Sequence, residues 1–219
     1  MQSPQATDWN RFWSKPASQQ FGRISWSKRR ILNVLKPYAL DGKNALDAGC
    51  GSGFFARYFC DRGMPTVAAD YSESALEMAR AATNGKSKLL KVDFLNEHLD
   101  QKLSERFDLI FSDGLLEHFS ADEQDRIIRN WASVLSKTGV MVTVVPNRFS
   151  PWEIIRPLYM PGIEEKPFIL KELVAVRERN GLRVIQKGGI NTFPFRFSPD
   201  RWIGSMFGML LYVIVKKFD

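Results

Sequence analysis

A glycine-rich turn between a short apolar segment and a predicted helix constrains the fold of this chain more than any other feature. Residues 45–53 read Ala-Leu-Asp-Ala-Gly-Cys-Gly-Ser-Gly, and residues 54–59 continue as Phe-Phe-Ala-Arg-Tyr-Phe. Because glycine has no Cβ and adopts positive φ readily, the backbone of such a turn can approach a bound ligand closely. The helix N-terminus after the turn offers free N–H groups and a partial positive charge. This combination predicts a nucleotide-type cofactor site at the edge of a parallel sheet.

The spacing of the glycines indicates which cofactor the turn binds. A dinucleotide-binding turn has the pattern Gly-x-Gly-x-x-Gly, whose third glycine would fall at Phe54. Asp47, two residues before the first glycine, would repel a pyrophosphate and would favour a cationic ligand. Both observations argue against a nicotinamide oxidoreductase.

The run from Asp47 to Gly53 closely resembles the first motif of the class I S-adenosylmethionine-dependent methyltransferases. The cofactor of that family has no phosphate and carries an ammonium and a sulfonium group, which suit a nearby carboxylate. The resemblance implies that the turn supplies these cofactor-binding residues: Asp47, Ala48, Gly49, Cys50, Gly51 and Gly53. S-adenosylmethionine is therefore the expected cofactor, and S-adenosylhomocysteine is its product.

The next two predicted strands also end in aspartates. Asp70 follows residues 66–69 and lies about 20 residues after the glycine turn, where an acid can accept both hydroxyl hydrogens of a ribose. Alternatively, Asp70 caps a helix over residues 72–82, and Tyr71 either packs on the adenine or lies on the surface. Asp93 and Phe94 follow a strand over residues 88–92. The resemblance implies that they bind the adenine amino group and ring; otherwise they are a loop aspartate and a core phenylalanine.

The segment after the fourth predicted strand, residues 112–119, resembles that of small-molecule methyltransferases. It is not the Asn/Asp-Pro-Pro-Tyr/Phe box of enzymes that methylate exocyclic or amide nitrogens. The resemblance implies cofactor contacts from three of its residues: Ser112, Asp113 and Gly114. His118 is the candidate general base because its pKa suits proton transfer near neutrality, although it could instead pack at a helix start. Glu117 and Asp113 are weaker candidates for this role.

The remaining elements complete an α/β fold. A helix over residues 121–135, a turn at residues 137–139 and a strand over residues 140–145 form a right-handed crossover. Beyond residue 170 the pattern predicts a helix (171–180) and two strands (182–186 and 209–215), the last antiparallel because its connection is too short for a helical crossover. The expected architecture is a doubly wound, mostly parallel, seven-stranded Rossmann-like sheet with an antiparallel last strand, helices on both faces and an N-terminal helical cap. Residues 1–40 would form the cap, and residues 41–219 the methyltransferase domain.

The charge distribution separates a cofactor half from an acceptor half. Residues 45–145 contain 11 Lys/Arg and 15 Asp/Glu, whereas the flanking segments 1–44 and 146–219 carry the excess positive charge that gives the chain its net +7. Two segments, 146–167 and 191–206, should form lids over the carboxyl edge of the sheet, where ligands of open α/β folds bind. Six aromatic and arginine residues are candidates for the acceptor side: Trp13, Arg23, Arg148, Trp152, Tyr159 and Arg196. Alternatively, these aromatics fill the core of the lid and the arginines face water.

The cysteines, the histidines and the hydrophobic stretches limit which cell compartment and which metal content we expect. Two cysteines and two histidines show no metal-binding spacing, so we expect no metal and a reduced, cytoplasmic environment. The N-terminus is polar, and the longest apolar stretch, residues 202–215, is too short to span a bilayer. The sequence does not decide whether the protein contacts a membrane peripherally, or whether it is a monomer or a homodimer.

The motifs together predict an S-adenosylmethionine-dependent methyltransferase that acts on a small or lipid-like acceptor. Aromatic walls with a few arginines suit an acceptor with an apolar or ring body and an anionic group. One alternative is an RNA-directed methyltransferase, which the basic run Lys28-Arg29-Arg30 would serve. Another is a non-catalytic scaffold that binds the cofactor. Nucleic acid is the less favoured partner because no base-flipping box is present.

Overall fold

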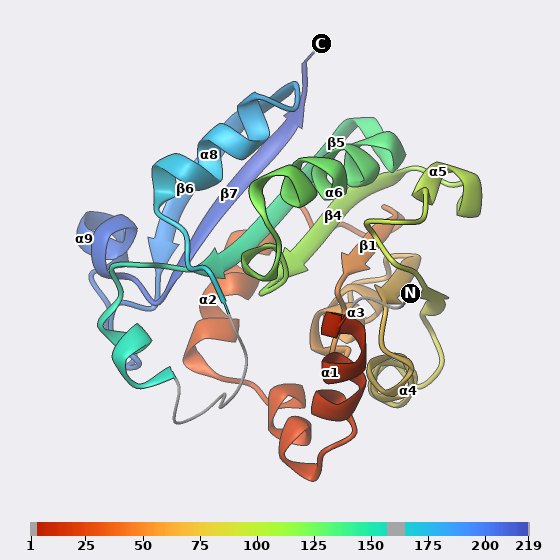
Figure 1. Ribbon diagram of the computed structural model, residues 1–219, viewed down its shortest axis with the longest axis horizontal. Coiled ribbons are helices and arrows are strands. Elements are labelled where there is room, and N and C mark those ends of the chain that lie inside the picture. The colour runs from red at the N-terminus through yellow and green to blue at the C-terminus, as the bar shows by residue number, and fades with distance from the viewer. Residues whose placement is uncertain (1–3, 157–164, 219) are drawn as a thin grey trace.

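The computed structural model describes residues 4–156 and 165–218, with side chains described from residue 9. Its centre is a seven-stranded sheet with the order β3-β2-β1-β4-β5-β7-β6 (Figure 1). The strands are β1 (Ala45–Ala48), β2 (Thr66–Asp70), β3 (Lys88–Lys91), β4 (Phe107–Asp113), β5 (Leu135–Pro146), β6 (Leu182–Ile190) and β7 (Leu210–Lys217). All neighbouring pairs are parallel except those of β7, which is antiparallel to both β5 and β6. The predicted Rossmann-like sheet with a reversed last strand is confirmed.

Helices cover both faces of the sheet. The helices are α1 (Pro4–Trp13), α2 (Trp26–Leu35), α3 (Phe54–Asp61), α4 (Glu73–Ala82), α5 (Leu99–Lys102), α6 (Ala121–Val134), α8 (Leu170–Glu178) and α9 (Asp200–Phe207), with 3₁₀ helices η1 (Pro16–Gly22), η2 (Leu116–His118) and η3 (Pro151–Ile154). Serine side chains begin three of them, because Ser25, Ser72 and Ser120 each accept a hydrogen bond from a backbone N–H three residues later. No helix among the described residues is long and apolar enough to cross a membrane.

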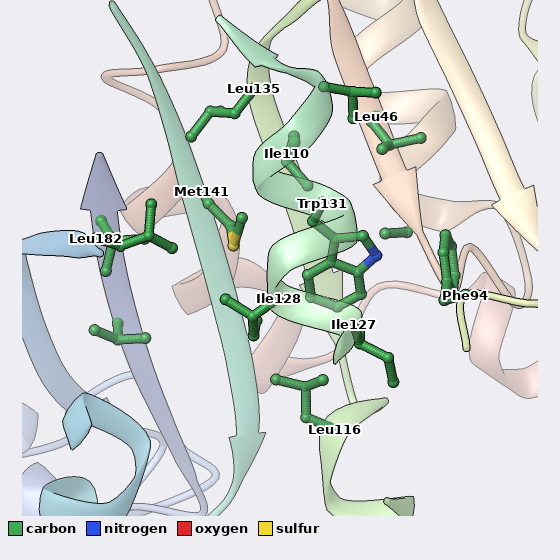
Figure 2. Packing of buried hydrophobic residues seen from close by; sticks show 14 of the residues in the cluster. Leu46, Phe94, Ile110, Leu116, Ile127, Ile128, Trp131, Leu135, Met141 and Leu182 are labelled. Carbon is green, nitrogen blue, oxygen red and sulfur yellow. The ribbon is translucent and has the colours of Figure 1, made fainter. Parts of the chain in front are cut away.

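Alternation along the strands divides the core into two layers. Ile110 packs in a cluster with Trp131 of α6, whereas Phe111 packs on the opposite face with Phe55 of α3. Successive strand residues point to opposite faces, so a fully buried strand contributes side chains to both layers. Trp131 lies at the centre of the first layer, between the strands and Phe94 (Figure 2). The two layers pack on opposite faces of the sheet and so determine where the strand ends lie.

Three details of the predicted C-terminal half were wrong. Residues 137–139 do not form a turn before the fifth strand: β5 begins at Leu135, which pairs with Phe107, and the register shifts before Val140 pairs with Leu109. Strand β6 also extends beyond Gln186 to Ile190. The predicted reversal of the last strand was right, but its stated reason was not, because the connection contains α9. Ile190 and Leu210 are register partners, so the chain leaves and re-enters the sheet at one edge without crossing it.

Candidate cofactor and active site

The glycine turn after β1 has the conformation that its sequence predicts. Gly49, Gly51 and Gly53 have φ values of 80°, 46° and 71°. A Cβ atom on Gly53 would lie 2.4 Å from the Cα of Ala79 in α4, and one on Gly51 would lie 2.5 Å from the Trp13 ring. The N–H groups of Gly49 and Cys50 both donate to the carbonyl of Ala69, which fixes the turn beside Ala48 at the end of β1. The turn is therefore a packed junction between two strands and two helices.

Two buried carboxylates at the ends of β1 and β2 hold this turn. Asp47 Oδ2 accepts a hydrogen bond from the Ala56 N–H at 2.8 Å. Asp70 accepts from the Gly51 N–H at 3.0 Å and from the Ser72 N–H at 2.9 Å. Burial raises the pKa of Asp47 to about 8 and also raises that of Asp70, while these backbone hydrogen bonds act in the opposite direction. A cationic ligand at this edge would favour the ionised form of both groups.

A third carboxylate, Asp113 at the end of β4, shares this edge with Lys28 of α2. Burial raises the pKa of Asp113 to about 6, and the positive charge of Lys28 opposes this shift. Burial lowers the pKa of Lys28 to about 8, against the attraction of Asp113. Lys28 Nζ donates to the carbonyl of Phe21 and, at 3.2 Å, to that of Arg23, and it lies 4.2 Å from the centroid of the Phe54 ring. The sequence showed Lys28 only as part of a basic run, because nothing local reveals that α2 lies against the glycine turn.

The N-terminal segment covers the glycine turn with aromatic rings. The rings of Phe12, Trp13 and Phe21 pack on one another, with centroids 5.0–5.9 Å apart. Ser52 Oγ donates to the carbonyl of Phe21 at 2.8 Å, which ties the turn to this segment. Trp13, predicted on the acceptor side, therefore contacts the glycine turn itself through Gly51.

The segment after β4 continues the same edge. Gly114 has a φ of 72°, and the side chain of Leu115 packs under Gly49. Ser112 is buried, and its Oγ has no hydrogen-bond partner within the described part of the chain. His118 lies in η2, with its ring edge-on to Trp9 at a centroid distance of 4.7 Å. The candidate base thus lies between the sheet edge and the N-terminal aromatic rings.

One group of possible metal ligands, unexpected from the sequence, occurs among residues 4–156 and 165–218. Glu117, His118 and Glu165 have ligand atoms that all lie within 4.8 Å of one another. Glu117 is 1% exposed, its Oε2 lacks a hydrogen-bond partner, and burial raises its pKa well above the ordinary value, an effect that the charge of Glu165 increases. Glu165 also forms an ion pair with Arg156 at 3.4 Å. These three side chains therefore form a compact, mostly acidic group beside η2.

The residues predicted to hold the adenine have partners within the protein. Asp93 accepts hydrogen bonds from the Leu95 N–H at 2.9 Å and from Asn96 Nδ2 at 2.7 Å. The Phe94 ring is buried edge-on against Trp131, with centroids 5.7 Å apart, and points into the core (Figure 2). Tyr71 lies partly buried directly after Asp70. The adenine roles of all three residues stay predictions.

The predicted acceptor-side residues do not form one cluster. Arg148 forms a two-pronged ion pair with Glu172 at 3.0 and 2.9 Å, so it joins the lid segment to α8. Arg196 lines a shallow pocket of about 410 Å³ with Trp26 and Arg29 of α2. Trp152 is partly buried in η3, Arg23 is exposed, and Tyr159 lies outside the described residues.

Comparison with known proteins identifies the family of this arrangement. Residues 46–143, from β1 into β5, match the family described as Methyltransferase domain (Methyltransf_11). This matched part of the chain is a methyltransferase domain, and the fold is that of the class I, S-adenosylmethionine-dependent methyltransferases. It is 25% identical to the ubiquinone biosynthesis O-methyltransferase of Coxiella burnetii (strain RSA 331 / Henzerling II) over 196 residues, which cover 84% of this chain and 82% of that protein. A second ubiquinone biosynthesis O-methyltransferase, from Rhodopseudomonas palustris (strain TIE-1), is 30% identical over 136 residues, or 61% of this chain and 51% of that one.

A solved structure shares the whole fold. The N-methyltransferase NodS from Bradyrhizobium japonicum WM9, in complex with S-adenosylhomocysteine, superposes with a TM-score of 0.72 over 99% of this chain and 100% of that one. Sequence identity between the two methyltransferases is 14%, so this likeness concerns the fold alone.

Proposed function

We propose that this methyltransferase transfers the methyl group of S-adenosylmethionine to a small or lipid-like acceptor that has an apolar or aromatic body and an anionic group. One observation carries the cofactor side of the proposal. Asp70 and Asp113 end two strands and Asp47 is the penultimate residue of β1 between them, around a positive-φ glycine turn, and burial raises the pKa of each. A cofactor with a sulfonium and an ammonium group adds positive charge to that of Lys28 and so favours the ionised form of these carboxylates.

Each part of the cofactor has a counterpart among these residues. Asp70 would accept hydrogen bonds from the ribose hydroxyls, and Asp113 would face the ammonium group. Lys28, beside Asp113 and the Phe54 ring, would bind the carboxylate of the methionine moiety. The Ser112 hydroxyl, which has no hydrogen-bond partner within the described part of the chain, offers one further polar contact. The residues present therefore fit a cofactor with an amino-acid moiety and an additional sulfonium charge better than they fit a pyrophosphate.

Methyl transfer requires little covalent chemistry from the protein. The bound cofactor supplies an activated methyl group, so the protein contributes alignment and exclusion of water. The aromatic rings of the N-terminal segment, which lie over the turn, would exclude water from the cofactor side. His118 would accept the proton of an acceptor hydroxyl or amine. Glu117 is less suited as a base because its side chain is 1% exposed and burial raises its pKa.

The acceptor class is supported by the lining of the carboxyl edge and by the relatives. Arg29 and Arg196 line a pocket with Ile24 and Trp26, which suits an apolar body with an anionic group. The curated relatives are named for O-methylation in ubiquinone biosynthesis. That name indicates a small-molecule acceptor, and we extend this class, without the specific compound, to this chain.

The test of the proposal measures cofactor binding before activity. Titration with S-adenosylmethionine, S-adenosylhomocysteine and NAD should raise the melting temperature with the first two alone. A ligand at 100 times its Kd adds about 2.7 kcal/mol, which corresponds to several degrees for a chain of this size. Asp70→Asn should weaken the binding of S-adenosylhomocysteine roughly thirty-fold, since hydrogen bonds to charged groups contribute about 2 kcal/mol. Asp61→Asn, an exposed change at the end of α3, is the matched control.

Activity is then measured by release of S-adenosylhomocysteine with a panel of anionic phenols, prenylated phenols, simple amines and tRNA. Turnover of the anionic or prenylated phenols supports the proposed acceptor class. A shift with NAD alone would overturn the cofactor assignment. Turnover of tRNA alone would leave the cofactor assignment standing and replace the acceptor class.

A further inference from the structure

The helix α9 presents its apolar side chains to solvent. Gly204 is the buried residue of this helix, and a Cβ there would lie 2.2 Å from the carbonyl oxygen of Gly189 in β6. The helix is therefore attached through backbone contact rather than through an apolar face. Trp202 is 81% exposed and Met206 is 57% exposed. A helix that packs on a sheet normally buries such residues, so their exposure here requires an explanation.

The loop before α9 extends this exposed surface. Phe195 and Phe197 are 65% and 84% exposed. The loop is closed by hydrogen bonds, because the N–H groups of Asn191 and Thr192 donate to Asp200 at 3.0 and 2.8 Å. Residues 193–207, hereafter the α9 segment, thus form one ordered projection at the margin of the molecule, beside the ends of β6 and β7 (Figure 1).

The α9 segment is positively charged at its surface. Its single carboxylate, Asp200, forms an ion pair with Arg30 of α2 at 2.9 Å. Arg196 and Arg201 are exposed, and neither forms an ion pair with any other residue in the described parts of the chain. Arg29 is also exposed and meets Arg196 at the pocket of about 410 Å³ between α2 and this segment. Unpaired arginines alternate with aromatic side chains, as in segments that enter the headgroup region of a bilayer.

We propose that the α9 segment docks the protein peripherally on an anionic lipid bilayer. Phe197, Trp202 and Met206 would enter the interfacial layer, while Arg29, Arg196 and Arg201 would bind lipid phosphates. The helix has eight residues and a length of about 12 Å, far less than the hydrocarbon thickness of about 30 Å, so it lies in the interface. A second copy fits this surface less well, because an isologous contact would bring like charges together.

Docking in this way places the acceptor half of the carboxyl edge against the membrane. A lipid-like acceptor could then enter from the bilayer without transfer of its apolar body through water. This consequence depends on the proposed acceptor class, whereas docking itself does not. Membrane binding is measured without cofactor or acceptor, so failure of either proposal can be recognised separately.

The experiment is co-sedimentation of the full chain with vesicles of phosphatidylglycerol and phosphatidylcholine in equal amounts, compared with pure phosphatidylcholine. We expect binding to the anionic vesicles that weakens at high salt. Arg196→Gln combined with Arg201→Gln should reduce the partition coefficient roughly thirty-fold, since each basic residue near such a surface contributes about fivefold. Phe197→Ser combined with Trp202→Ser should reduce it by at least about tenfold.

Matched controls lie at the opposite, amino edge of the sheet. Leu40→Ser removes an exposed apolar side chain, and Lys86→Gln combined with Lys137→Gln removes two exposed cations. Both should retain wild-type partition, and every variant should keep its thermal shift with S-adenosylhomocysteine. Equal loss in the controls, equal binding to neutral vesicles, or binding unchanged by the α9 variants would overturn the proposal. The proposal would also be overturned if the wild-type protein did not bind vesicles and light scattering showed a dimer that the α9 variants dissociate.

Discussion

At the ends of β1 and β2, Asp47 and Asp70 are buried and held by backbone N–H groups, whereas around α9 aromatic and arginine side chains face solvent. Both regions lie at the carboxyl edge of one sheet. The structure of the first region depends on the backbone geometry of the glycine turn and on buried carboxylates in a site of low dielectric constant. The second is attached by the close contact of Gly204 with Gly189 and by the polar contacts of Asp200, while its aromatic side chains pack little against the protein. We infer that the glycine turn and its carboxylates tolerate little change, and that the exposed side chains of the α9 segment can vary at small cost to stability.

The largest expected effect concerns the pH dependence of stability in the cofactor half. The pKa of Asp47 rises from 3.8 to about 8 on folding, so the folded state retains a proton that the unfolded state loses between these values. Stability without cofactor should therefore fall as pH rises from about 4 to 8, by at most on the order of 5 kcal/mol from this group. Asp47→Asn should remove that part of the slope in urea titrations at several pH values. Parallel pH profiles for the two proteins would contradict the assigned burial.

The glycine turn offers the next largest effect. Gly53→Ala places a Cβ against the backbone of α4 at a φ of 71°, and should lower the free energy of unfolding by about 2–4 kcal/mol. Gly85→Ala is the matched control because its φ is also 71° but no atom lies within 4 Å of the new Cβ. The control should lose only about 1 kcal/mol in urea denaturation. Equal losses would show that backbone strain, and not close packing, makes Gly53 necessary.

Lys28 tests whether the N-terminal segment contributes to the cofactor site. Lys28→Met should weaken the binding of S-adenosylhomocysteine about tenfold by calorimetry, because a charge-assisted hydrogen bond to its carboxylate is lost. Lys36→Met, an exposed change after the same helix, should leave affinity unchanged. Unchanged affinity in Lys28→Met would show that Lys28 does not bind the cofactor and serves only its contacts with Phe21 and Arg23.

The smallest expected effect lies in the acceptor half. Trp202→Ser should change the free energy of unfolding by no more than about 0.5 kcal/mol, because the side chain is 81% exposed. Thermal and urea denaturation measure this directly. A loss above about 2 kcal/mol would show that Trp202 packs against the protein and would remove the contrast between the two halves.

Local signals predicted the cofactor half well. The glycines, the apolar strand segments and the aspartates at their ends are short-range features, and the strands end at Ala48, Asp70 and Asp113 in the structure. The register around β5 was less predictable. Residues 137–139 carry turn-like residues, yet pairing of Leu135 with Phe107 draws them into the strand. Residues 136–139 lie in the register shift before Val140 pairs with Leu109, so the pairing of Leu135, and not a local pattern, decides where β5 begins.

The sequence by itself determined the alternation of strands and helices, the positive-φ turn and the type of cofactor, because hydrophobic period, glycine conformation and charge act within a few residues. Only the tertiary structure decided which distant groups meet. Lys28 reaches the edge that holds Asp113, Glu165 approaches Glu117 and His118, and Arg30 pairs with Asp200. These contacts join residues far apart in the chain, and their geometry depends on how two core layers pack on one sheet. No local pattern contains that information.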